Sequence, residues 1–423
     1  MLINYILFLM TFLLFGGITL DAGLLELRRL RIQQAADAAA QEAMYQFARN
    51  SSSWSSAGKA QAAMNGFTDG SNGVTVSIAN PPTTGTYAGN TLVFQATVAQ
   101  NVNTLLMGLL NHGTSTIAAT AFAEELPTCF WIMNNSGTSP NGSLRMQSAT
   151  LNANCGVYIN TSGNNSQKNL NLDFWARLTV SGSRIRVVGP YSDNISSTQC
   201  CFGGMIGINP QPRYAATVKS DPLAYVTAPS LSSCTYNNTS FWGGTHTLSP
   251  GTYCGGIDIA NNATVTFSPG LYIIAGGLSS SDSYIYGTGV TLYFTKTSGA
   301  SSYSPITVTG PCCSVSTYGL YLKAPTSSAN GGIPGVVMFA DRNWVDHGNQ
   351  DFQFNYATLQ TDGYWYLPNT GLYMWATNLT YYKYNGLVID NYYQFGTTNY
   401  LNSDFSDLGG VSPLHYEDGV LVQ

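Results

Sequence analysis

The chain opens with two consecutive stretches that predict a long helix: residues 1–20 read MLINYILFLMTFLLFGGITL, and residues 21–50 read DAGLLELRRLRIQQAADAAAQEAMYQFARN. The first stretch carries no charged side chain. As a helix rising about 1.5 Å per residue it would be about 30 Å long, which is the thickness of a bilayer's apolar core. No proline interrupts the second stretch. We therefore expect one continuous helix from near Met1 to about Ala48.

The second stretch is amphipathic. Ile32, Ala36, Ala39, Ala43 and Phe47 recur at helical spacing, which predicts one apolar stripe. Polar side chains occupy the opposite side of that helix, namely Arg29, Gln33, Asp37 and Gln41. This half should therefore pack on a small head, while the first half forms an anchor or a filament core. The residues expected to form that anchor surface and its charged boundary are Leu2, Ile6, Phe8, Phe12, Phe15, Leu20, Asp21, Arg28 and Arg29.

The same residues carry a family resemblance. An apolar helix that ends in an Asp-x-Gly step, an Arg-rich turn and a Gln-x-Ala-Ala-Asp-Ala-Ala-Ala run resembles the N-terminal signature of TadE/TadG-like proteins of the tight-adherence (Tad) pilus system. The matching residues are Asp21, Gly23, Arg28, Arg29, Gln33, Ala35, Ala36, Asp37, Ala38, Ala39 and Ala40. The resemblance implies a membrane-inserted, pilin-like subunit that is exported beyond the inner membrane. One residue departs from the pilin pattern, because Tyr5 stands where processed pilins often carry Glu.

The arginines that follow the apolar stretch bear on topology. Arg28, Arg29 and Arg31 lie after residues 1–20, and no basic residue lies before them. The positive-inside rule would place the C-terminal side in the cytoplasm, whereas the cysteines described below indicate export. Both hold if a basic leader preceded Met1 and was removed by a prepilin peptidase. In the alternative, Met1 is the true start and the arginines do not set topology.

The composition is that of an extracellular, β-rich protein. Charged residues make up 9% of the 423 residues and hydrophobic residues 44%, whereas an ordinary domain has about 25% charged residues. Ser, Thr, Asn, Gln and Gly fill the polar positions. A net charge of −5 provides no basic surface, which excludes nucleic acid as an expected partner.

The eight cysteines all follow residue 128. An even number in an exported chain indicates disulfides. On loop length and context we predict the pairs Cys129–Cys155 and Cys234–Cys254. The pairing of the other four cysteines stays open. Bonds that join one of the two vicinal pairs, Cys200 and Cys201, to the other, Cys312 and Cys313, are favoured over a bond within each pair. No CxxC motif is present, so neither a zinc site nor any other metal or cofactor is expected.

Residues 51–126 predict a small head. Residues 73–82 and 90–99 alternate apolar and polar side chains, as strands do, and residues 115–125 read as a third strand. Residues 103–110 read as a short helix. An α+β head packed on the N-terminal helix fits this order, and a plain three-stranded meander is the alternative.

Residues 127–423 have the local features of an all-β domain. A segment SPGTYCGGIDIANNATVTF begins at Ser249, and a related segment SPGLYIIAGGLSSSDSYIYGTGVTLYF begins 19 residues later at Ser268. A repeat near 20 residues with several short strands predicts a right-handed parallel β-helix or solenoid. A β-sandwich is the alternative.

An enzyme is not expected. Residues 222–340 contain only Asp258, Asp282, Lys296 and Lys323 as charged groups, which are too few for the acid–base pair of a glycosidase or lyase. The densest polar segment, DRNWVDHGNQD at residues 341–351, reads as a solvated loop, with a calcium loop or catalytic patch as the alternative.

The aromatic residues of the β-rich part allow a sugar-binding face. Trp344, Trp365 and Trp375 are the candidates. The favoured interpretation, however, places them in the core or in contacts between subunits, because aromatic residues favour both strands and interfaces.

Together these observations place the chain in the α+β class, with an N-terminal helix over residues 1–50, a pilin-like head over 51–126 and an all-β ectodomain over 127–423. The expected function is that of a structural subunit of an extracellular Tad or type IV-like filament, reached through a single-span inner-membrane intermediate. Its partners would be copies of itself and the pilus assembly machinery. The alternative is a membrane-anchored minor pilin or tip adhesin that binds surface glycans through the β domain.

Overall fold

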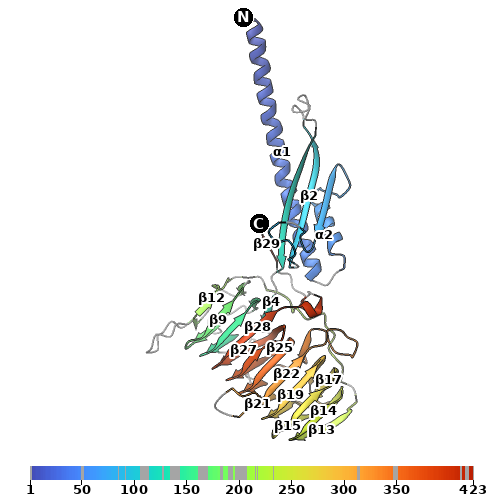
Figure 1. The fold of residues 1–423 in the computed structure, drawn as a ribbon, viewed down its shortest axis with the longest axis vertical. Coiled ribbons are helices and arrows are strands. Elements are labelled where there is room, and N and C mark those ends of the chain that lie inside the picture. The colour runs from blue at the N-terminus through green and yellow to red at the C-terminus, as the bar shows by residue number, and fades with distance from the viewer. Residues whose placement is uncertain are drawn as a thin grey trace. The chain divides into compact units, whose positions relative to one another are not determined.

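The computed structural model describes residues 2–48, 52–83, 85–90, 92–104, 114–125, 128–133, 143–160, 170–181, 184–188, 194–195, 207–214, 216, 218–231, 233–311, 315–345, 351–409, 412–414 and 419–422. The chain forms two units: unit 1 contains Met1–Leu126 and His415–Gln423, and unit 2 contains Pro127–Leu414 (Figure 1). Unit 2 is therefore an insertion near the end of unit 1. The last nine residues, which the sequence placed with the ectodomain, belong to unit 1.

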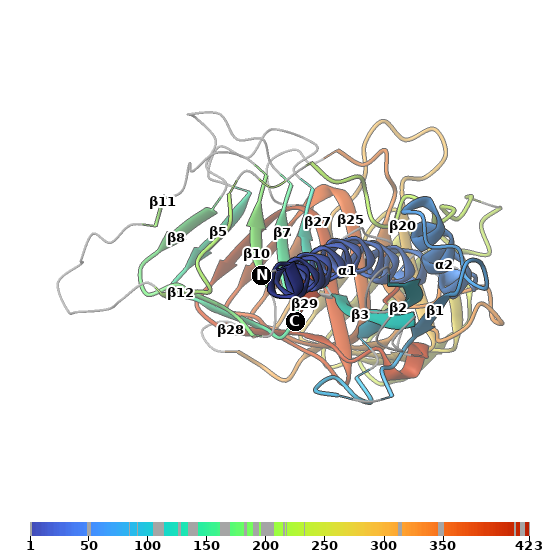
Figure 2. The same ribbon diagram turned by 90° about the horizontal axis from the view of Figure 1, so that it is seen from above.

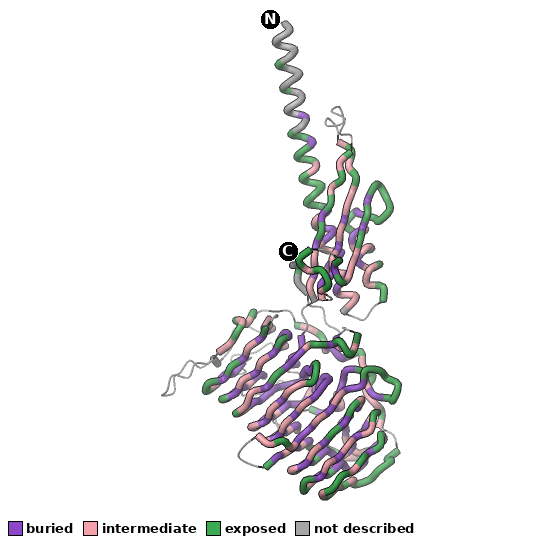
Figure 3. Tube along the Cα trace, in the orientation of Figure 1, coloured by how far each residue is buried: buried purple, intermediate pink, exposed green. Residues whose placement is uncertain are grey.

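Unit 1 contains two helices, α1 (Leu2–Ala48) and α2 (Trp54–Met64), among its described residues. The predicted stripe of α1 is buried: Ile32, Ala36, Ala39 and Ala43 have no exposed surface. Residues 22–24 and 26–31 are exposed, whereas Ile32 and Ala35 are buried. Figure 3 shows this change from exposed to buried along the helix. The sequence did not predict α2. It lies close to α1, because a Cβ placed on Gly58 would come within 2.9 Å of the Ala39 carbonyl oxygen.

The sheet of unit 1 is antiparallel, with the strand order β1-β2-β3-β29. Its strands are β1 (Val74–Ala79), β2 (Val93–Asn103), β3 (Thr114–Glu125) and β29 (Gly419–Val422). The first three are the predicted strands, and Val76, Phe94 and Val98 pack with α1 in one core. The fourth was not predicted: Leu421 pairs with Ala123 at the free side of β3. Most of the predicted helix over 103–110 lies outside the described residues.

Unit 2 is a stack of parallel strands with three strand positions in each turn of chain. The first position is formed by β13 (Tyr236–Trp242), β15 (Gly251–Ala260), β17 (Gly270–Ala275), β20 (Val290–Thr295), β23 (Val336–Ala340), β25 (Thr358–Trp375), β27 (Tyr384–Phe395), β4 (Thr128–Ile132), β7 (Gly156–Ile159) and β10 (Ile185–Val187). The second halves of β15, β25 and β27 continue into the second position. The other strands of that position are β18 (Leu278–Ser281), β21 (Ile306–Thr309), β24 (Phe352–Asn355), β5 (Leu144–Gln147), β8 (Leu170–Asp173) and β11 (Asn194–Ile195).

The third position begins with β14 (Thr245–Leu248), β16 (Thr264–Phe267), β19 (Tyr284–Thr288), β22 (Gly319–Lys323), the first half of β25 and β26 (Asn378–Thr380). It also contains β28 (Thr398–Ser403), β6 (Thr150–Ala153), β9 (Arg177–Val180) and β12 (Gly207–Asn209). A 3₁₀-helix covers Ser406–Leu408. Leucine, isoleucine, valine and phenylalanine side chains from all three positions point inward and form one continuous core.

The chain enters this stack in the middle and leaves it in the middle. From β4 it winds outward to β12, then crosses to β13 at the other end and winds back to β27, which pairs in parallel with β4. Figure 2 shows β10 and β7 in the same row of strands as β27 and β25, and β4 lies between β7 and β27, which are far apart in sequence. The closure of the stack therefore depends on contacts between its first and last turns.

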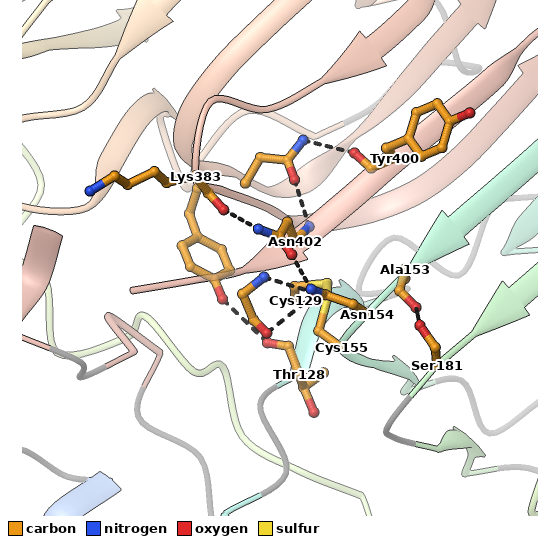
Figure 4. The surroundings of a disulfide bond; sticks show 12 residues. Thr128, Cys129, Ala153, Asn154, Cys155, Ser181, Lys383, Tyr400 and Asn402 are labelled. Carbon is orange, nitrogen blue, oxygen red and sulfur yellow. Dashed lines mark hydrogen bonds between the residues drawn. A yellow bond between two sulfur atoms is a disulfide. The ribbon is translucent and has the colours of Figure 1, made fainter. Parts of the chain in front are cut away.

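A disulfide and an asparagine network mark this closure (Figure 4). Cys129 bonds to Cys155, and the neighbouring Asn154 amide donates to the Asn402 side chain of β28. The Asn402 backbone N–H donates in turn to Asn385 Oδ1 at 2.9 Å. Covalent and polar contacts thus join segments about 250 residues apart at one place.

The predicted fold class is wrong. Within the described residues the chain has two α-helices and twenty-nine β-strands, so it is mainly β rather than α+β. The error came from giving the helical start the same weight as the much longer strand-forming remainder. The pairings among β4–β28 are parallel except for β27 with β28, whereas the alternative sandwich would need antiparallel sheets.

The repeat seen in the sequence has a local physical cause. The Tyr253 hydroxyl donates to the Ser249 carbonyl at 2.7 Å, and the Tyr272 hydroxyl donates to the Ser268 carbonyl at 2.8 Å. Each tyrosine thus satisfies the backbone oxygen that precedes its own Pro-Gly turn. Tyr321 makes the same contact with the Thr317 carbonyl at 2.6 Å.

Candidate assembly surface and pocket on the N-terminal helix

The first half of α1 carries large apolar side chains that the chain itself does not cover. We define the apolar face as Phe8, Phe12, Leu20, Leu24, Leu27 and Leu30, all of which are exposed. The exposed fraction of Phe12 is 68%. Buried apolar area is the main source of stability in folding and association, so this face is suited to contact with another apolar surface.

Several predicted anchor residues cannot be placed as side chains. Leu2, Ile6 and Phe15 belong to α1, but their side chains lie outside those that the structure describes. Phe8, Phe12 and Leu20 are exposed as expected. Among the described residues, no helix has the length and apolar character needed to cross a membrane.

A pocket of about 300 Å³ lies between α1 and the end of β2. Its apolar wall is formed by Leu24, Leu25 and Leu27 from α1 and by Val102 from β2. The polar lining comes from Asp21, Arg28 and Arg31 of the helix and from Asn103 and Thr104 at the end of β2. Residues 21, 24, 25, 28 and 31 follow helical spacing, which brings them to one side of α1.

The charged residues of the pocket differ in how far they are buried. The side chain of Asp21 is only 3% exposed and makes a polar contact within the chain. Arg28 and Arg31 are exposed, and neither makes a hydrogen bond or ion pair with any described residue. With two guanidinium groups and one carboxylate, the lining carries one net positive charge. The pocket therefore favours a ligand with a single negative charge.

Sequence reasoning identified part of this pocket. It named Asp21 and Arg28 as the boundary of the apolar stretch, but it missed Arg31 and the leucines as pocket residues. Their helical spacing was a usable signal. The contribution of residues 102–104 could not be read from the sequence, because it depends on how β2 packs against α1.

The N-terminal segment also matches a known family. Residues 5–48 match the Flp pilus-assembly TadE/G-like family. This segment is TadE/G-like. The TadE/G-like segment contains the apolar face and every helical residue of the pocket. At the level of the family, the match indicates a pilus-associated role. No curated protein and no solved structure matches the chain.

Two predicted disulfides are confirmed in unit 2. Cys129 bonds to Cys155 and Cys234 bonds to Cys254, each with a Cα–Cα distance of 5.6 Å. The second bond ties the segment before β13 to β15. Cys200, Cys201, Cys312 and Cys313 lie outside the described residues, so their pairing stays a prediction.

The tryptophans suggested as a sugar-binding face occupy other surroundings. Trp344 and Trp365 are buried in the core of unit 2. Trp375 is half-buried and stacks on Phe395 with ring centroids 4.0 Å apart. A buried indole has no face for a sugar, so the favoured interpretation as core residues is confirmed for Trp344 and Trp365.

The described part of the polar segment 341–351 serves packing. Arg342 donates to the carbonyl oxygens of Leu223 and Val226, each at 2.9 Å, and so holds the chain that crosses toward β13. Burial and the nearby Asp341 carboxylate raise the pKa of Tyr293 to about 12. Asp346 and His347 lie outside the described residues. Elsewhere in the described chain, no group of three His, Cys, Asp or Glu side chains is arranged to hold a metal ion.

Proposed function

We propose that this chain is a non-enzymatic, pilin-like subunit that assembles into an extracellular Tad-type filament through α1. The observation that carries the proposal is the apolar face, which lies in the TadE/G-like segment and is uncovered in the single chain. Its neighbours in the filament would be the same faces of other copies. The proposal includes delivery by the pilus assembly machinery and passage through an inner-membrane intermediate.

Burial of the apolar face would stabilise the filament. Each large apolar side chain that is removed from water contributes about 1.5–3 kcal/mol. Leu20 and Leu30 are exposed, and helical spacing places them on the side of α1 away from the buried stripe of Ile32 and Ala39, so they can meet another helix while the head stays folded. The Ala-rich half already has its own partners in unit 1, which leaves the first half for assembly.

The test is to place a charge on the apolar face. Phe12→Asp should abolish filaments at the cell surface, because assembly would then bury an unpaired carboxylate. The matched control is Val218→Asp in unit 2, where an apolar side chain is exposed to a similar degree, 69% against 68%. Electron microscopy of surface filaments, with blotting for subunit level, measures the result. Wild-type numbers of filaments in Phe12→Asp would show that the helix is not the assembly element.

A second role, as a minor or tip subunit that binds glycans, is favoured by exposed aromatic residues on unit 2. Trp175 and Trp242 are exposed. Trp175 follows β8, and Trp242 is the last residue of β13. Immunogold labelling distinguishes the two roles. Label along the whole filament favours the major subunit, whereas label confined to filament tips favours the adhesin.

A further inference from the structure

We infer that the pocket between α1 and β2 is a binding site for the phosphodiester headgroup of a phospholipid. In this assignment Arg28 and Arg31 hold the phosphate, and the acyl chains lie along Leu24, Leu27 and the neighbouring Leu20. The inference goes beyond filament assembly and does not depend on it, because binding is a property of the single chain.

The charge of the pocket matches that of a phosphodiester. Arg28 and Arg31 lie one turn apart on one side of α1, line the same pocket and have no partner among the described residues. Guanidinium groups bind phosphate oxygens with two parallel hydrogen bonds. The Asp21 carboxylate in the lining leaves one net positive charge. A phosphodiester carries one negative charge, so ligand and pocket balance.

The apolar surroundings of the pocket favour a lipid over a free anion. Leucines line the pocket beside the arginines, and Leu20, Leu24 and Leu27 continue from it as exposed apolar surface. A free anion would leave these side chains in water, whereas a lipid would cover them. Basic residues beside an apolar helical segment are the usual pattern of lipid headgroup recognition.

The volume of the pocket limits which part of a lipid can enter it. The cavity volume of about 300 Å³ is at the lower end of the range for small-molecule sites. It accommodates a headgroup but not two acyl chains, which must therefore run outside along the apolar face. This geometry predicts that headgroup and chains contribute separately to binding.

The experiment titrates the purified full chain in a neutral detergent with three probes and follows heat. The probes are short-chain phosphatidylglycerol, the matching diacylglycerol without phosphate, and inorganic phosphate. We expect clear binding of phosphatidylglycerol only. Binding of diacylglycerol with equal affinity would overturn recognition of the phosphate. Equal affinity for inorganic phosphate would show a free-anion site and would overturn the assignment to lipid.

Variants assign the binding to the pocket. Arg28→Gln with Arg31→Gln should weaken phosphatidylglycerol binding by about tenfold or more, since each loses a charge-assisted hydrogen bond. Arg29→Gln is the matched control, because Arg29 has the same charge on the same turn but does not line the pocket. An equal loss in Arg29→Gln would indicate diffuse attraction and refute the site. Arg28→Lys with Arg31→Lys, which keeps the charge, should fall between them and guards against misfolding of the double variant.

Discussion

Asp362 shows what one buried carboxylate does in a protein with so few charges. Its side chain is 6% exposed, and Lys323 Nζ lies 3.9 Å from Oδ2. Oδ1 accepts three backbone N–H groups, from Tyr382 at 2.9 Å, Lys383 at 2.6 Å and Tyr384 at 3.2 Å. The carboxylate thus closes the turn between β26 and β27, which no motif in the sequence indicated.

Replacing this carboxylate separates its two roles. Asp362→Ala leaves buried N–H groups without an acceptor and should destabilise unit 2 by about 1–3 kcal/mol. Asp362→Asn keeps the accepting oxygen and should cost much less. Chemical denaturation of both variants measures the difference in the free energy of unfolding. Equal losses would mean that the charge, and not the acceptor, stabilises the turn.

The same residue gives a pH dependence. Burial raises the pKa of Asp362 above its ordinary value of 3.8, although the backbone N–H groups oppose this. The folded state therefore holds its proton more tightly than the unfolded state. The contribution of Asp362 to stability should fall as pH rises from about 4 through the folded-state pKa. The measurement is the free energy of unfolding of the parent minus that of Asp362→Asn, taken from denaturation at several pH values. An increase of this difference with pH would contradict the prediction.

At the scale of elements, β29 is a short strand that joins the sheet of unit 1 although it is far from the other strands of that sheet in sequence. It pairs with the end of β3, with Val420 opposite Glu124 and Leu421 opposite Ala123. The strand gives β3 an antiparallel partner on the side away from β2. Four residues at the end of the chain thus belong to the sheet formed near its start.

Removing β29 should weaken unit 1 and leave unit 2 intact. Deletion of residues 419–423 removes the strand's backbone hydrogen bonds, each with a net value of about 0.5–1.5 kcal/mol. Calorimetry should show one of two unfolding transitions at a lower temperature. The control is Leu421→Thr, which keeps a strand-forming residue at an exposed position. An unchanged transition in the deletion would mean that β29 adds no stability.

The helix pair makes a second test at this scale. Gly58→Ala would place a Cβ 2.9 Å from the Ala39 carbonyl oxygen and 3.1 Å from Ala43 Cβ. The gain in helix propensity, about 0.5–1 kcal/mol, should be outweighed by overpacking, which costs about 1–3 kcal/mol. Thermal unfolding of unit 1 measures the balance. A stabilised variant would show that the two helices can move apart at little cost.

At the scale of the whole molecule, unit 2 is closed by contacts between its first and last turns. β27 pairs with β4, and Asn154 bonds to Asn402 beside the Cys129–Cys155 bond. Such a stack cannot complete its middle until its last strands are in place. The two described disulfides thus hold different regions, one at the closure and one at the β13 end.

Each disulfide should contribute through the loop that it closes. The cysteines are 26 and 20 residues apart, and loops of this length correspond to about 3 kcal/mol. Cys129→Ala with Cys155→Ala, and Cys234→Ala with Cys254→Ala, should each lower the stability of unit 2 by a similar amount. Denaturation without reductant measures both. A negligible loss in one pair would show that its loop is already ordered in the unfolded chain.

The predictions that succeeded depended on local pattern. The stripe of Ile32, Ala36, Ala39 and Ala43, the strands β1–β3 and the two described disulfides followed from spacing and loop length. The predictions that failed needed neighbours that local pattern does not show. The fold class was wrong, and α2 and β29 were not predicted. The favoured interpretation of Trp344 and Trp365 as core residues was confirmed.

Local sequence pattern was sufficient to predict α1, β1–β3 and the TadE/G-like start, because helical and strand periodicity and an uncharged run are properties of adjacent residues. Tertiary structure alone decided that β27 meets β4, that β29 completes the first sheet, and that residues 102–104 form a pocket with Asp21, Arg28 and Arg31. These contacts join residues far apart along the chain. Their energy depends on packing in three dimensions, which no local pattern records.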